Sequence, residues 1–478
     1  MEKILYAAAE CTPFIKTGGL GAVVGSLPKQ LRQRGYDVRI VLPLYECIGE
    51  KWKKQMTESL PFPVHVGWRS QPVTIHTLTY EGIPCYFLSN EHYFGGEGPY
   101  GEMWQDVEKF SFFSKAVLEM LAFLEFEPDV IHCHDWQTSL IPVYLRRLYG
   151  ENPFYHDIKT VMTIHNMRFQ GMGDLAYTQD VTGLPDDVFT YDKLEYYGSA
   201  NLLKGGIAFA DKITTVSSTY AEEIQQPEYG EGLDGLLRYR SGDLCGIVNG
   251  IDYQIYSPSQ DPMIKYHYNV KTFRKAKKKN KTVLQNRAGL PVKKATFAVC
   301  MITRLTEQKG MDLLGPMLDE FLQQDVQLYI LGGGEKDYEG MFSYYREQYP
   351  NKVFVDFDYT DELAKLMYAG CDATIMPSKF EPCGLSQLMA LRYGTVPIVR
   401  FTGGLKDTVK PYRPEYGIGT GFGFEEYTSD ALKRTLGEAF AVYKNHPAEW
   451  GEIVERGMKE NYSWSMSCSE YEKLYDSL

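Results

Sequence analysis

The feature that most constrains the fold of this 478-residue chain is the motif Thr-Gly-Gly-Leu, which occurs twice, at 17–20 and at 402–405. Each copy lies between a predicted strand and a predicted helix. Glycine lets the chain turn tightly after a strand and approach a ligand, and the helix N-terminus that follows favours an anion. Either copy alone is compatible with an ordinary strand-to-helix turn. Two copies, near opposite ends of the chain, indicate two αβ halves that present glycine-rich edges to one shared cleft.

Strand-like apolar runs alternate with helical patterns in both halves. In the first half the predicted strands are 3–9, 38–43, 73–79, 84–88, 130–133, 160–164 and 212–216, with helices at 107–123 and 139–148. In the second half the strands are 297–302, 326–331, 353–356, 373–376 and 396–400, with helices beginning near residues 310, 335, 361, 384 and 429. This rhythm predicts an α/β protein with two doubly wound, mostly parallel sheets.

The length of the chain also predicts two domains, because 478 residues are too many for a single core. A stretch rich in Gly, Asn and Pro at 246–262 is typical of a hinge. The last residues, 460–478, are helical in pattern and rich in aromatics, and we expect them to cross back onto the first domain. The predicted domains are therefore 1–250 completed by 460–478, and 251–459.

Composition narrows the class of protein. The net charge of −12 argues against nucleic acid as the main partner. The basic run at 271–281 stands against that trend, and such runs are usually solvated helix faces or linkers. No apolar stretch reaches the ~20 residues of a membrane span, and we expect no signal peptide because a strand pattern begins directly after Met1-Glu2. Nine scattered cysteines without CxxC spacing are typical of reduced thiols, so the expected location is the cytoplasm.

Ligands of open αβ sheets bind beyond the carboxyl ends of the strands, and polar or glycine residues follow almost every predicted strand here. Arg304 and Lys309 follow one strand and could neutralise a diphosphate without magnesium, although a surface ion pair is the alternative. Glu381 precedes a predicted helix and is either a functional carboxylate or a helix cap. His165 and Asp135 follow buried strands, and each could equally belong to the core.

Familiar motifs of other enzyme classes are absent from the sequence. It has no G-x-G-x-x-G, Walker loop, H-E-x-x-H or G-x-S-x-G. Asp356-Phe357-Asp358 matches the D-x-D pattern by which some nucleotide-sugar enzymes hold a divalent metal. A three-residue match is common by chance, and the alternative is an ordinary strand end.

Several blocks of residues together resemble the bacterial glycogen synthase and plant starch synthase family. The blocks are Lys16-Thr17-Gly18-Gly19-Leu20, His134-Asp135-Trp136, Thr163-Ile164-His165-Asn166, Asn249-Gly250-Ile251-Asp252, Thr303-Arg304-Leu305-Thr306-Glu307-Gln308-Lys309-Gly310, Pro377-Ser378-Lys379-Phe380-Glu381-Pro382-Cys383-Gly384-Leu385 and Thr402-Gly403-Gly404-Leu405. They follow the family order from Met1 to about Trp464. The resemblance implies two Rossmann-like domains facing a central cleft (the GT-B type). It also implies a retaining transfer of glucose from ADP-glucose to the non-reducing end of an α-1,4-glucan, with no metal or other cofactor.

The resemblance also implies roles for single residues. It implies that Glu381 is the essential carboxylate, that His165 contacts the transferred glucose, and that Arg304 and Lys309 bind the diphosphate. The implied substrate-binding residues are Lys16, Gly18, Gly19, Asp135, Asn166, Asn249, Tyr359, Cys383, Gly384, Leu385, Thr402, Gly403 and Gly404. Tyr359 corresponds to an aromatic against the adenine, which favours Asp356-x-Asp358 as a strand end.

One position departs from the family pattern, which usually reads Lys-Thr-Gly-Gly-Leu-x-Asp-Val. This chain has Ala22 where the aspartate belongs, so one acidic contact near the sugars is in doubt. Two rival functions remain: another retaining two-domain glycosyltransferase, such as a sucrose- or trehalose-forming enzyme, and a glucan-binding protein on a decayed synthase scaffold. Lys16, His165, Arg304, Lys309 and Glu381 are all present, which argues against decay.

Overall fold

The computed structural model describes residues 2–478 and divides the chain into two compact units. The first unit ends at Ile247 and also contains Ser467–Leu478, and the second runs from Val248 to Met466. Met1, with which the predicted first domain begins, lies outside the described residues. Among the residues described, no helix is both long and apolar enough to cross a membrane.

The first unit is built on one large sheet. Its strands are β1 (Lys3–Ala7), β2 (Asp37–Pro43), β3 (Thr57–Glu58), β4 (Phe62–Val66), β5 (Arg69–Tyr80), β6 (Ile83–Ser89), β7 (Val130–His134), β8 (Lys159–Ile164), β12 (Lys212–Thr215) and β13 (Leu244–Gly246). A small separate sheet contains β9 (Met172–Asp174), β10 (Glu195–Tyr196) and β11 (Ser199–Asn201). The helices are α1 (Gly19–Val24), α2 (Leu27–Gln33), α3 (Glu50–Lys53), α4 (Glu91–Phe94), α5 (Met103–Phe123), α6 (Leu140–Tyr144), α7 (Leu175–Thr182), α8 (Leu202–Phe209), α9 (Ser218–Glu223) and α10 (Asp234–Tyr239).

The order of strands in this sheet is β13-β12-β8-β7-β1-β2-β6-β5-β3, with β4 paired to β5. The pairs from β13 through β6 are parallel, whereas β5 joins β6, β3 and β4 in antiparallel fashion. The chain leaves β1 toward β2 and returns to the other side of β1 at β7. The loops after β1 and β7 therefore diverge, which makes this edge a topological switch point where doubly wound sheets bind ligands.

The second unit repeats the plan with six strands. They are β14 (Phe297–Ile302), β15 (Val326–Leu331), β16 (Val353–Asp356), β17 (Ala373–Met376), β18 (Val396–Arg400) and β19 (Phe422–Phe424), in the order β16-β15-β14-β17-β18-β19. Its helices are α11 (Phe273–Arg287), α12 (Met311–Gln323), α13 (Lys336–Gln348), α14 (Asp361–Gly370), α15 (Ser386–Arg392), α16 (Gly403–Thr408), α17 (Ser429–Asn445) and α18 (Pro447–Lys459). All pairs are parallel, and the switch point lies between β14 and β17.

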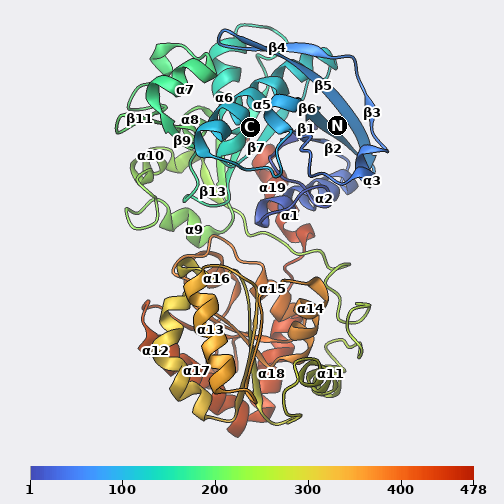
Figure 1. The fold of residues 1–478 in the computed structure, drawn as a ribbon, viewed down its shortest axis with the longest axis vertical. Coiled ribbons are helices and arrows are strands. Elements are labelled where there is room, and N and C mark those ends of the chain that lie inside the picture. The colour runs from blue at the N-terminus through green and yellow to red at the C-terminus, as the bar shows by residue number, and fades with distance from the viewer. Residues whose placement is uncertain (1) are drawn as a thin grey trace. The chain divides into compact units, whose positions relative to one another are not determined.

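The strands of the second unit form where the sequence carries short, continuous apolar runs. Every residue of β14 and β15 is buried, as expected for central parallel strands covered by helices on both faces. The amphipathic helix α12 buries Leu314, Leu318 and Leu322 against this core, and α17 packs beside it. Figure 1 shows the helices of this unit flanking the sheet.

The last helix, α19 (Trp464–Tyr475), carries the chain back into the first unit, where Figure 1 draws it in red beside β7. The hydroxyl oxygens of Tyr475 and Tyr6 lie 2.6 Å apart, and Tyr475 also contacts His132 Nδ1 at 2.7 Å. The returning helix thus packs against β1 and β7, the two strands that flank the switch point.

The basic run at 271–281 corrects one expectation. It forms most of α11, but it is not simply a solvated face, because Lys281 is buried with a side chain only 2 % exposed and Lys277 is partly buried. The predicted helix at 139–148 is also less regular than expected. A 3-10 turn (Trp136–Thr138) precedes α6, and a π-helical turn (Leu145–Tyr149) follows it.

Candidate active site

The glycine loop after β1 is held in place by a buried carboxylate. Glu10 is 3 % exposed and accepts hydrogen bonds from Thr17 N at 2.6 Å, Thr17 Oγ1 at 2.5 Å and Gly18 N at 3.3 Å. Tyr100 OH also donates to Glu10 Oε1, the oxygen that accepts from Thr17 Oγ1, at 2.6 Å. Glu10 therefore fixes the backbone from which Lys16 projects.

The tip of this loop is open. Lys16 is exposed and has no hydrogen-bond or ion-pair partner among residues 2–478. A Cβ added at Gly18 or Gly19 would meet no atom within 4 Å, so packing within the protein does not require glycine there. An open backbone beside an unpaired cation suits a ligand that approaches the main chain.

Asp135 and His165 meet at the next strand ends. The Asp135 carboxylate accepts the His165 backbone N–H at 2.7 Å, and Asp135 has the unusual φ of 56° for a non-glycine residue. Such strain is concentrated at functional sites. Burial raises the pKa of Asp135 to about 7, although the backbone N–H groups of His165 and Asn166 act in the opposite direction.

Three histidines lie in a stack behind this contact. The rings of His132 and His134 are 4.4 Å apart between centroids, and His134 Nδ1 lies 3.0 Å from His165 Nε2. Burial lowers the pKa of His132 and of His165 to about 3 and lowers that of His134 strongly. At neutral pH the stack is therefore uncharged, and His165 at its partly exposed end acts as a neutral hydrogen-bonding group.

In the second unit the carboxylate of Glu381 is paired with Lys309. Lys309 Nζ lies 2.6 Å from Glu381 Oε2, and Ser378 Oγ donates to the same oxygen at 3.0 Å. Lys309 follows β14 and Glu381 follows β17, so the pair spans the switch point of this sheet. The Glu381 side chain does not cap α15, because that helix has no side-chain cap.

The second Thr-Gly-Gly-Leu loop packs against the segment that carries Glu381. A Cβ at Gly403 would overlap the carbonyl oxygen of Glu381, and one at Gly404 would overlap that of Cys383. The Gly404 N–H donates to the carbonyls of Glu381 and Pro382 at 3.1 and 3.2 Å. Unlike Gly18 and Gly19, these glycines are required by close packing within the protein.

Cys383 and Asn249 lie together beneath this loop. The Asn249 backbone N–H contacts the Cys383 thiol, whose pKa burial raises to about 12, so the thiol is protonated and unreactive. Asn249 is 5 % exposed, and its side-chain Oδ1 is buried without a partner among residues 2–478. A buried acceptor without a donor is a place where a ligand hydroxyl or a water gains a hydrogen bond.

The remaining predicted residues lie around the same strand ends. Arg304 is exposed after β14, and its guanidinium has no hydrogen-bond or ion-pair partner within residues 2–478. Tyr359, after β16, is 57 % exposed and donates to Asp361 Oδ1 at 2.9 Å. Asn166 accepts the Arg168 backbone N–H at 3.0 Å, Gly384 has a φ of +73°, and Leu385 and Thr402 immediately precede α15 and α16.

Sequence reasoning missed Glu10, Ser378 and the buried role of His134. Glu10 could have been found, because an acid directly after an apolar strand and before a glycine loop must satisfy its charge locally. Ser378 lies only three residues before Glu381, so this contact is local in sequence, whereas only the fold brings His134 to His165.

The alternative reading of Asp356-Phe357-Asp358 was a site for a divalent metal. Asp356 Oδ1 accepts the Asp358 N–H at 3.1 Å, which closes a local turn after β16. Across residues 2–478 no group of three or more His, Cys, Asp or Glu side chains is placed to hold a metal ion.

Comparison with known proteins places the chain among glycosyltransferases. The family description "Starch synthase catalytic domain" matches residues 3–239, and "Glycosyl transferases group 1" matches residues 283–455. A glycogen synthase of Lachnospira eligens is 52 % identical, and one of Lachnoclostridium phytofermentans is 51 % identical. Both alignments cover 100 % of each chain.

Solved structures agree. The catalytic domain of starch synthase IV from Arabidopsis thaliana, bound to ADP and acarbose, superposes with a TM-score of 0.91 at 32 % identity, covering 100 % of this chain and 99 % of that one. Sucrose-phosphate synthase from Thermosynechococcus elongatus is 16 % identical with a TM-score of 0.63 and shares the fold alone. These comparisons confirm the family resemblance and the fold class of two Rossmann-like domains with a returning C-terminal helix.

Proposed function

Because the chain belongs to the glycogen and starch synthase family of glycosyltransferases, we propose that it transfers glucose from ADP-glucose to the non-reducing end of an α-1,4-glucan. The relatives are glycogen synthases over their full length, and the related starch synthase binds ADP and acarbose. Glycogen and maltooligosaccharides are the proposed acceptors. The nine free cysteines fit the reducing cytoplasm as the site of this reaction.

The pair of Lys309 and Glu381 is the observation that carries the proposal. It lies at the switch point of the second sheet, where nucleotide ligands of such folds bind. Departure of ADP leaves negative charge on the diphosphate and positive charge on the sugar. Lys309 can stabilise the negative charge on the diphosphate, and Glu381, held 2.6 Å away from it, can stabilise the positive charge on the sugar.

In this proposal Lys309 and Arg304 bind the diphosphate. Arg304 is exposed and unpaired, so it has donors available for phosphate oxygens. Lys309 exchanges part of its contact with Glu381 for the phosphate, and Ser378 keeps the carboxylate in position. Tyr359 provides an exposed ring for the adenine, and Thr402, Gly403, Gly384 and Leu385 shape the surrounding turns.

Residues of the first unit contribute the sugar contacts. His165 is neutral, so it can accept or donate a hydrogen bond to a glucose hydroxyl without adding charge. Asp135, held against the His165 backbone, and Asn166 supply further polar contacts. Lys16 and the open glycines beside it suit the phosphate side of the donor.

Retention follows, in this proposal, from attack by the glucan hydroxyl on the face that the phosphate leaves. Glu381 then supports positive charge on the sugar without forming a bond to it. The alternative is a covalent glycosyl-enzyme through a carboxylate, as in retaining glycosidases. Because Lys309 and Arg304 neutralise the diphosphate in this proposal, the reaction needs no divalent metal ion.

A donor and acceptor assay tests the function. The protein is incubated with glycogen and either ADP-glucose or UDP-glucose, and also with ADP-glucose and fructose or glucose 6-phosphate. Glucan growth from ADP-glucose supports the proposal. Product only with the small acceptors would favour a disaccharide-forming enzyme, and glycogen binding without turnover would favour a glucan-binding protein.

A further inference from the structure

A concave site lies at the edge of the second sheet opposite Lys309 and Glu381. Its pocket of about 350 Å³ is lined mainly by α11, α17 and α18 together with residues that precede β14, β17 and β18. Because the strands are parallel, these residues lie at the amino ends, whereas Lys309 and Glu381 lie beyond the carboxyl ends. A six-residue strand separates the two edges by about 20 Å.

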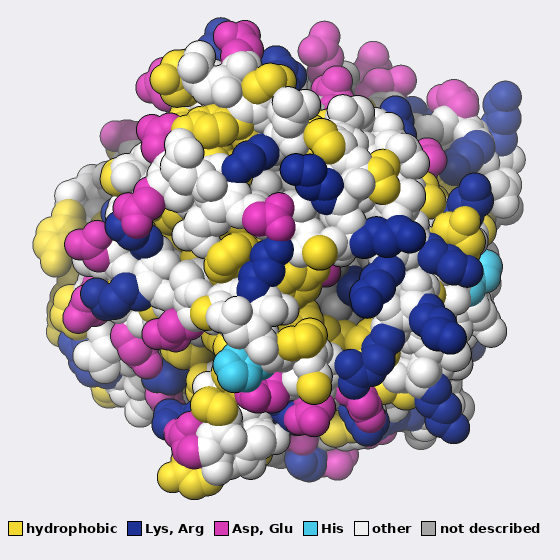
Figure 2. Space-filling view, turned by 90° about the horizontal axis from the view of Figure 1, so that it is seen from below, with side chains coloured by type: hydrophobic (Ala, Val, Ile, Leu, Met, Phe, Trp, Pro, Cys, Tyr) yellow, Lys and Arg dark blue, Asp and Glu magenta, His cyan; other side chains and the backbone are white. Residues whose placement is uncertain are grey.

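Positive charge dominates the lining. It contains Arg274, Lys277, Lys278, Lys281, Lys294 and Lys444, and Asp372 is the one carboxylate among the described residues that line it. Figure 2 shows Lys and Arg side chains gathered on the right of the face seen from below, on the side where Figure 1 draws α11. In a chain with a net charge of −12, this concentration of cations stands out.

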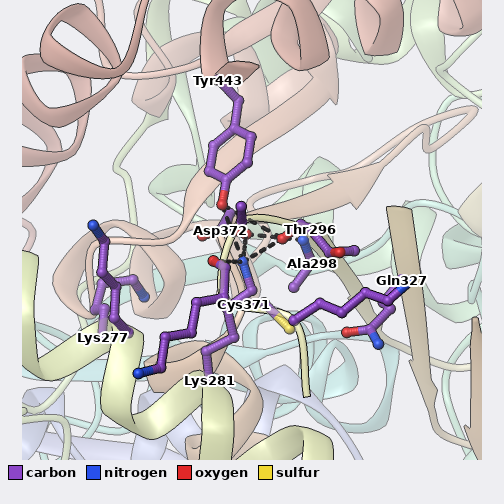
Figure 3. Close-up of polar contacts among 12 residues, drawn as sticks. Lys277, Lys281, Thr296, Ala298, Gln327, Cys371, Asp372 and Tyr443 are labelled. Carbon is purple, nitrogen blue, oxygen red and sulfur yellow. Dashed lines mark hydrogen bonds and ion pairs between the residues drawn. The ribbon is translucent and has the colours of Figure 1, made fainter. Parts of the chain in front are cut away.

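Two of the lysines are committed to the fold. Lys281 Nζ pairs with Asp372 Oδ2 at 2.5 Å and contacts the Thr296 carbonyl and Tyr443 OH, as the dashed lines in Figure 3 show. Lys277 Nζ donates to the carbonyls of Tyr368 and Tyr393 and to Thr395 Oγ1 at 2.9–3.1 Å. These two ammonium groups neutralise helix C-termini and the one carboxylate, so Asp372 does not offset the other cations.

The other four cations differ in whether they are paired within the protein. The ammonium groups of Lys278 and Lys294 have no partner among residues 2–478. Arg274 lies against Gly451, where an added Cβ would overlap its guanidinium. Lys444 pairs with Asp325 Oδ2 at 2.5 Å. Unpaired like charges around one cavity repel each other, and an anion in the cavity relieves that repulsion.

The pocket also has an apolar wall formed by Phe273, Tyr443, Trp450 and Val454. Its volume falls within the range of small-molecule sites. A concave site with a wall of this kind fits a compact ligand better than a nucleic acid or a membrane, which the overall negative charge repels.

We propose that this pocket is a binding site for a small organic phosphate, whose phosphoryl group contacts Lys278, Lys294 and Arg274 and whose organic part lies on the Trp450 side. The site is separate from the proposed transfer site. Burial lowers the pKa of Lys277 to about 8, and a bound phosphate favours the charged form of this lysine as well.

Calorimetric titration of the full-length protein tests the proposal with three probes: inorganic phosphate, ribose 5-phosphate and AMP. We expect at least one organic probe to bind tenfold or more tightly than inorganic phosphate. Ribose 5-phosphate and AMP differ by the adenine ring, so their relative affinities tell whether the sugar or the ring contacts the apolar wall. The affinity should fall when the salt concentration is raised.

Matched variants locate the binding. The double variant Lys278→Ala/Lys294→Ala removes exposed, unpaired side chains and should weaken binding tenfold or more. Lys271→Ala/Lys275→Ala also removes two exposed charges, which lie on or directly before α11 and do not line the pocket, and should leave the affinity unchanged. Lys309→Ala should also leave it unchanged.

Three results would overturn the proposal. One is that neither organic probe binds more tightly than inorganic phosphate. Another is equal weakening by the two double variants, which would indicate a general charge effect. The third is loss of binding in Lys309→Ala, which would place the probe at the transfer site. None of these measurements depends on turnover, so they are independent of the proposed function.

Discussion

At the scale of single residues, the contact between Lys309 and Glu381 links the proposed leaving-group site to the proposed sugar site. The pair is largely buried, with side chains 16 % and 7 % exposed. Removing one partner of a buried pair leaves an uncompensated charge, so substitutions here alter stability as well as chemistry. Variants must therefore be compared in both respects.

Glu381→Gln keeps the shape of the side chain and removes its charge. We expect turnover with ADP-glucose and glycogen to fall by about 10²–10³-fold, the usual loss when one charge-stabilising group is removed from a transition state. ADP affinity should change little, because Lys309 is retained. Steady-state kinetics and ADP titration measure both quantities. Near-normal turnover would show that Glu381 serves only to position Lys309.

Lys309→Ala should weaken ADP binding by ~1.5–3 kcal/mol, the usual range for hydrogen bonds to charged groups. Lys433→Ala, which removes a surface lysine paired with Glu320, is the control and should not alter ADP affinity. Activity of the unaltered protein should survive excess EDTA. Loss of activity in chelator, restored by magnesium or manganese, would return attention to Asp356 and Asp358.

Ala22 tests how this chain compensates for a missing carboxylate. It is the fourth residue of α1 and is partly exposed, and no acidic residue lies in the first turn of that helix. If the contact is absent, Ala22→Asp should raise kcat/KM by roughly tenfold to a hundredfold, as a charged hydrogen bond of ~1.5–3 kcal/mol implies. An unchanged value in a folded variant would show that another group, such as Glu10 or Asp135, has taken over the contact.

At the scale of secondary structure, the sequence predicted some elements to within a residue and others not at all. The first five strands of the second unit match their predicted bounds, because each is a short, mostly apolar run between polar segments. β19 was missed because it is only three residues long and pairs with a single strand, β18, at the edge of the sheet. The basic run in α11 was expected to be solvated. Lys281 is buried in it and Lys277 partly buried because they donate to backbone carbonyls that are distant in sequence, and such contacts leave no local pattern.

The candidate site shows the same limit. Residues that directly follow strands were predictable from the strand pattern alone, and Lys309, Glu381, Asp135 and His165 all lie just beyond the carboxyl ends of parallel strands. The pairing of Lys309 with Glu381 was not predictable, because 72 residues separate the two in sequence. Contacts of that kind depend on which strands become neighbours, and no local pattern encodes this.

The histidine stack between β7 and β8 predicts a pH dependence of stability. The pKa of His132 is lowered to about 3 in the folded protein, against about 6.5 when unfolded. The stability that the buried neutral His132 contributes is therefore fully present above pH 6.5 and is lost as the pH falls toward 3. Between these values it contributes a slope of about 1.4 kcal/mol per pH unit. Asp135, with its raised pKa, acts in the opposite direction, losing stability as the pH rises from about 4 to about 7.

His132→Asn should accordingly flatten the dependence of unfolding free energy on pH between about 6 and 4. Denaturant melts of the two proteins at pH 7, 6, 5 and 4 give the difference in slope. Substitution of the exposed His92 by Asn is the matched control and should leave the slope unchanged. Parallel curves for His132→Asn and the unaltered protein would mean that His132 is already charged in the folded state.

At the scale of the whole molecule, the chain begins in the first unit, builds the second and returns to the first. The returning segment buries Cys468, Tyr471, Leu474 and Tyr475. Tyr475 links Tyr6 of β1 to His132 of β7, and His132 continues the network to Thr163 at 2.6 Å. The core behind the first switch point is therefore complete only when the last residues of the chain have been added.

This arrangement predicts that the first unit depends on the C-terminus for stability. Tyr475→Phe keeps the ring and removes the hydroxyl, leaving the buried His132 Nδ1 and Tyr6 hydroxyl without their partner. Leaving such groups unsatisfied should cost about 1–3 kcal/mol of unfolding free energy. A chain that ends at Met466 also loses the buried aromatic rings and should be destabilised by considerably more, with each large side chain contributing roughly 1.5–3 kcal/mol. Hydrogen exchange followed by mass spectrometry locates the effect: both changes should speed exchange in β1 and β7 and leave β14 and β15 unaffected. Equal acceleration in both units would show that the returning helix supports the molecule as a whole, whereas no acceleration in β1 would show that the first unit is complete without it.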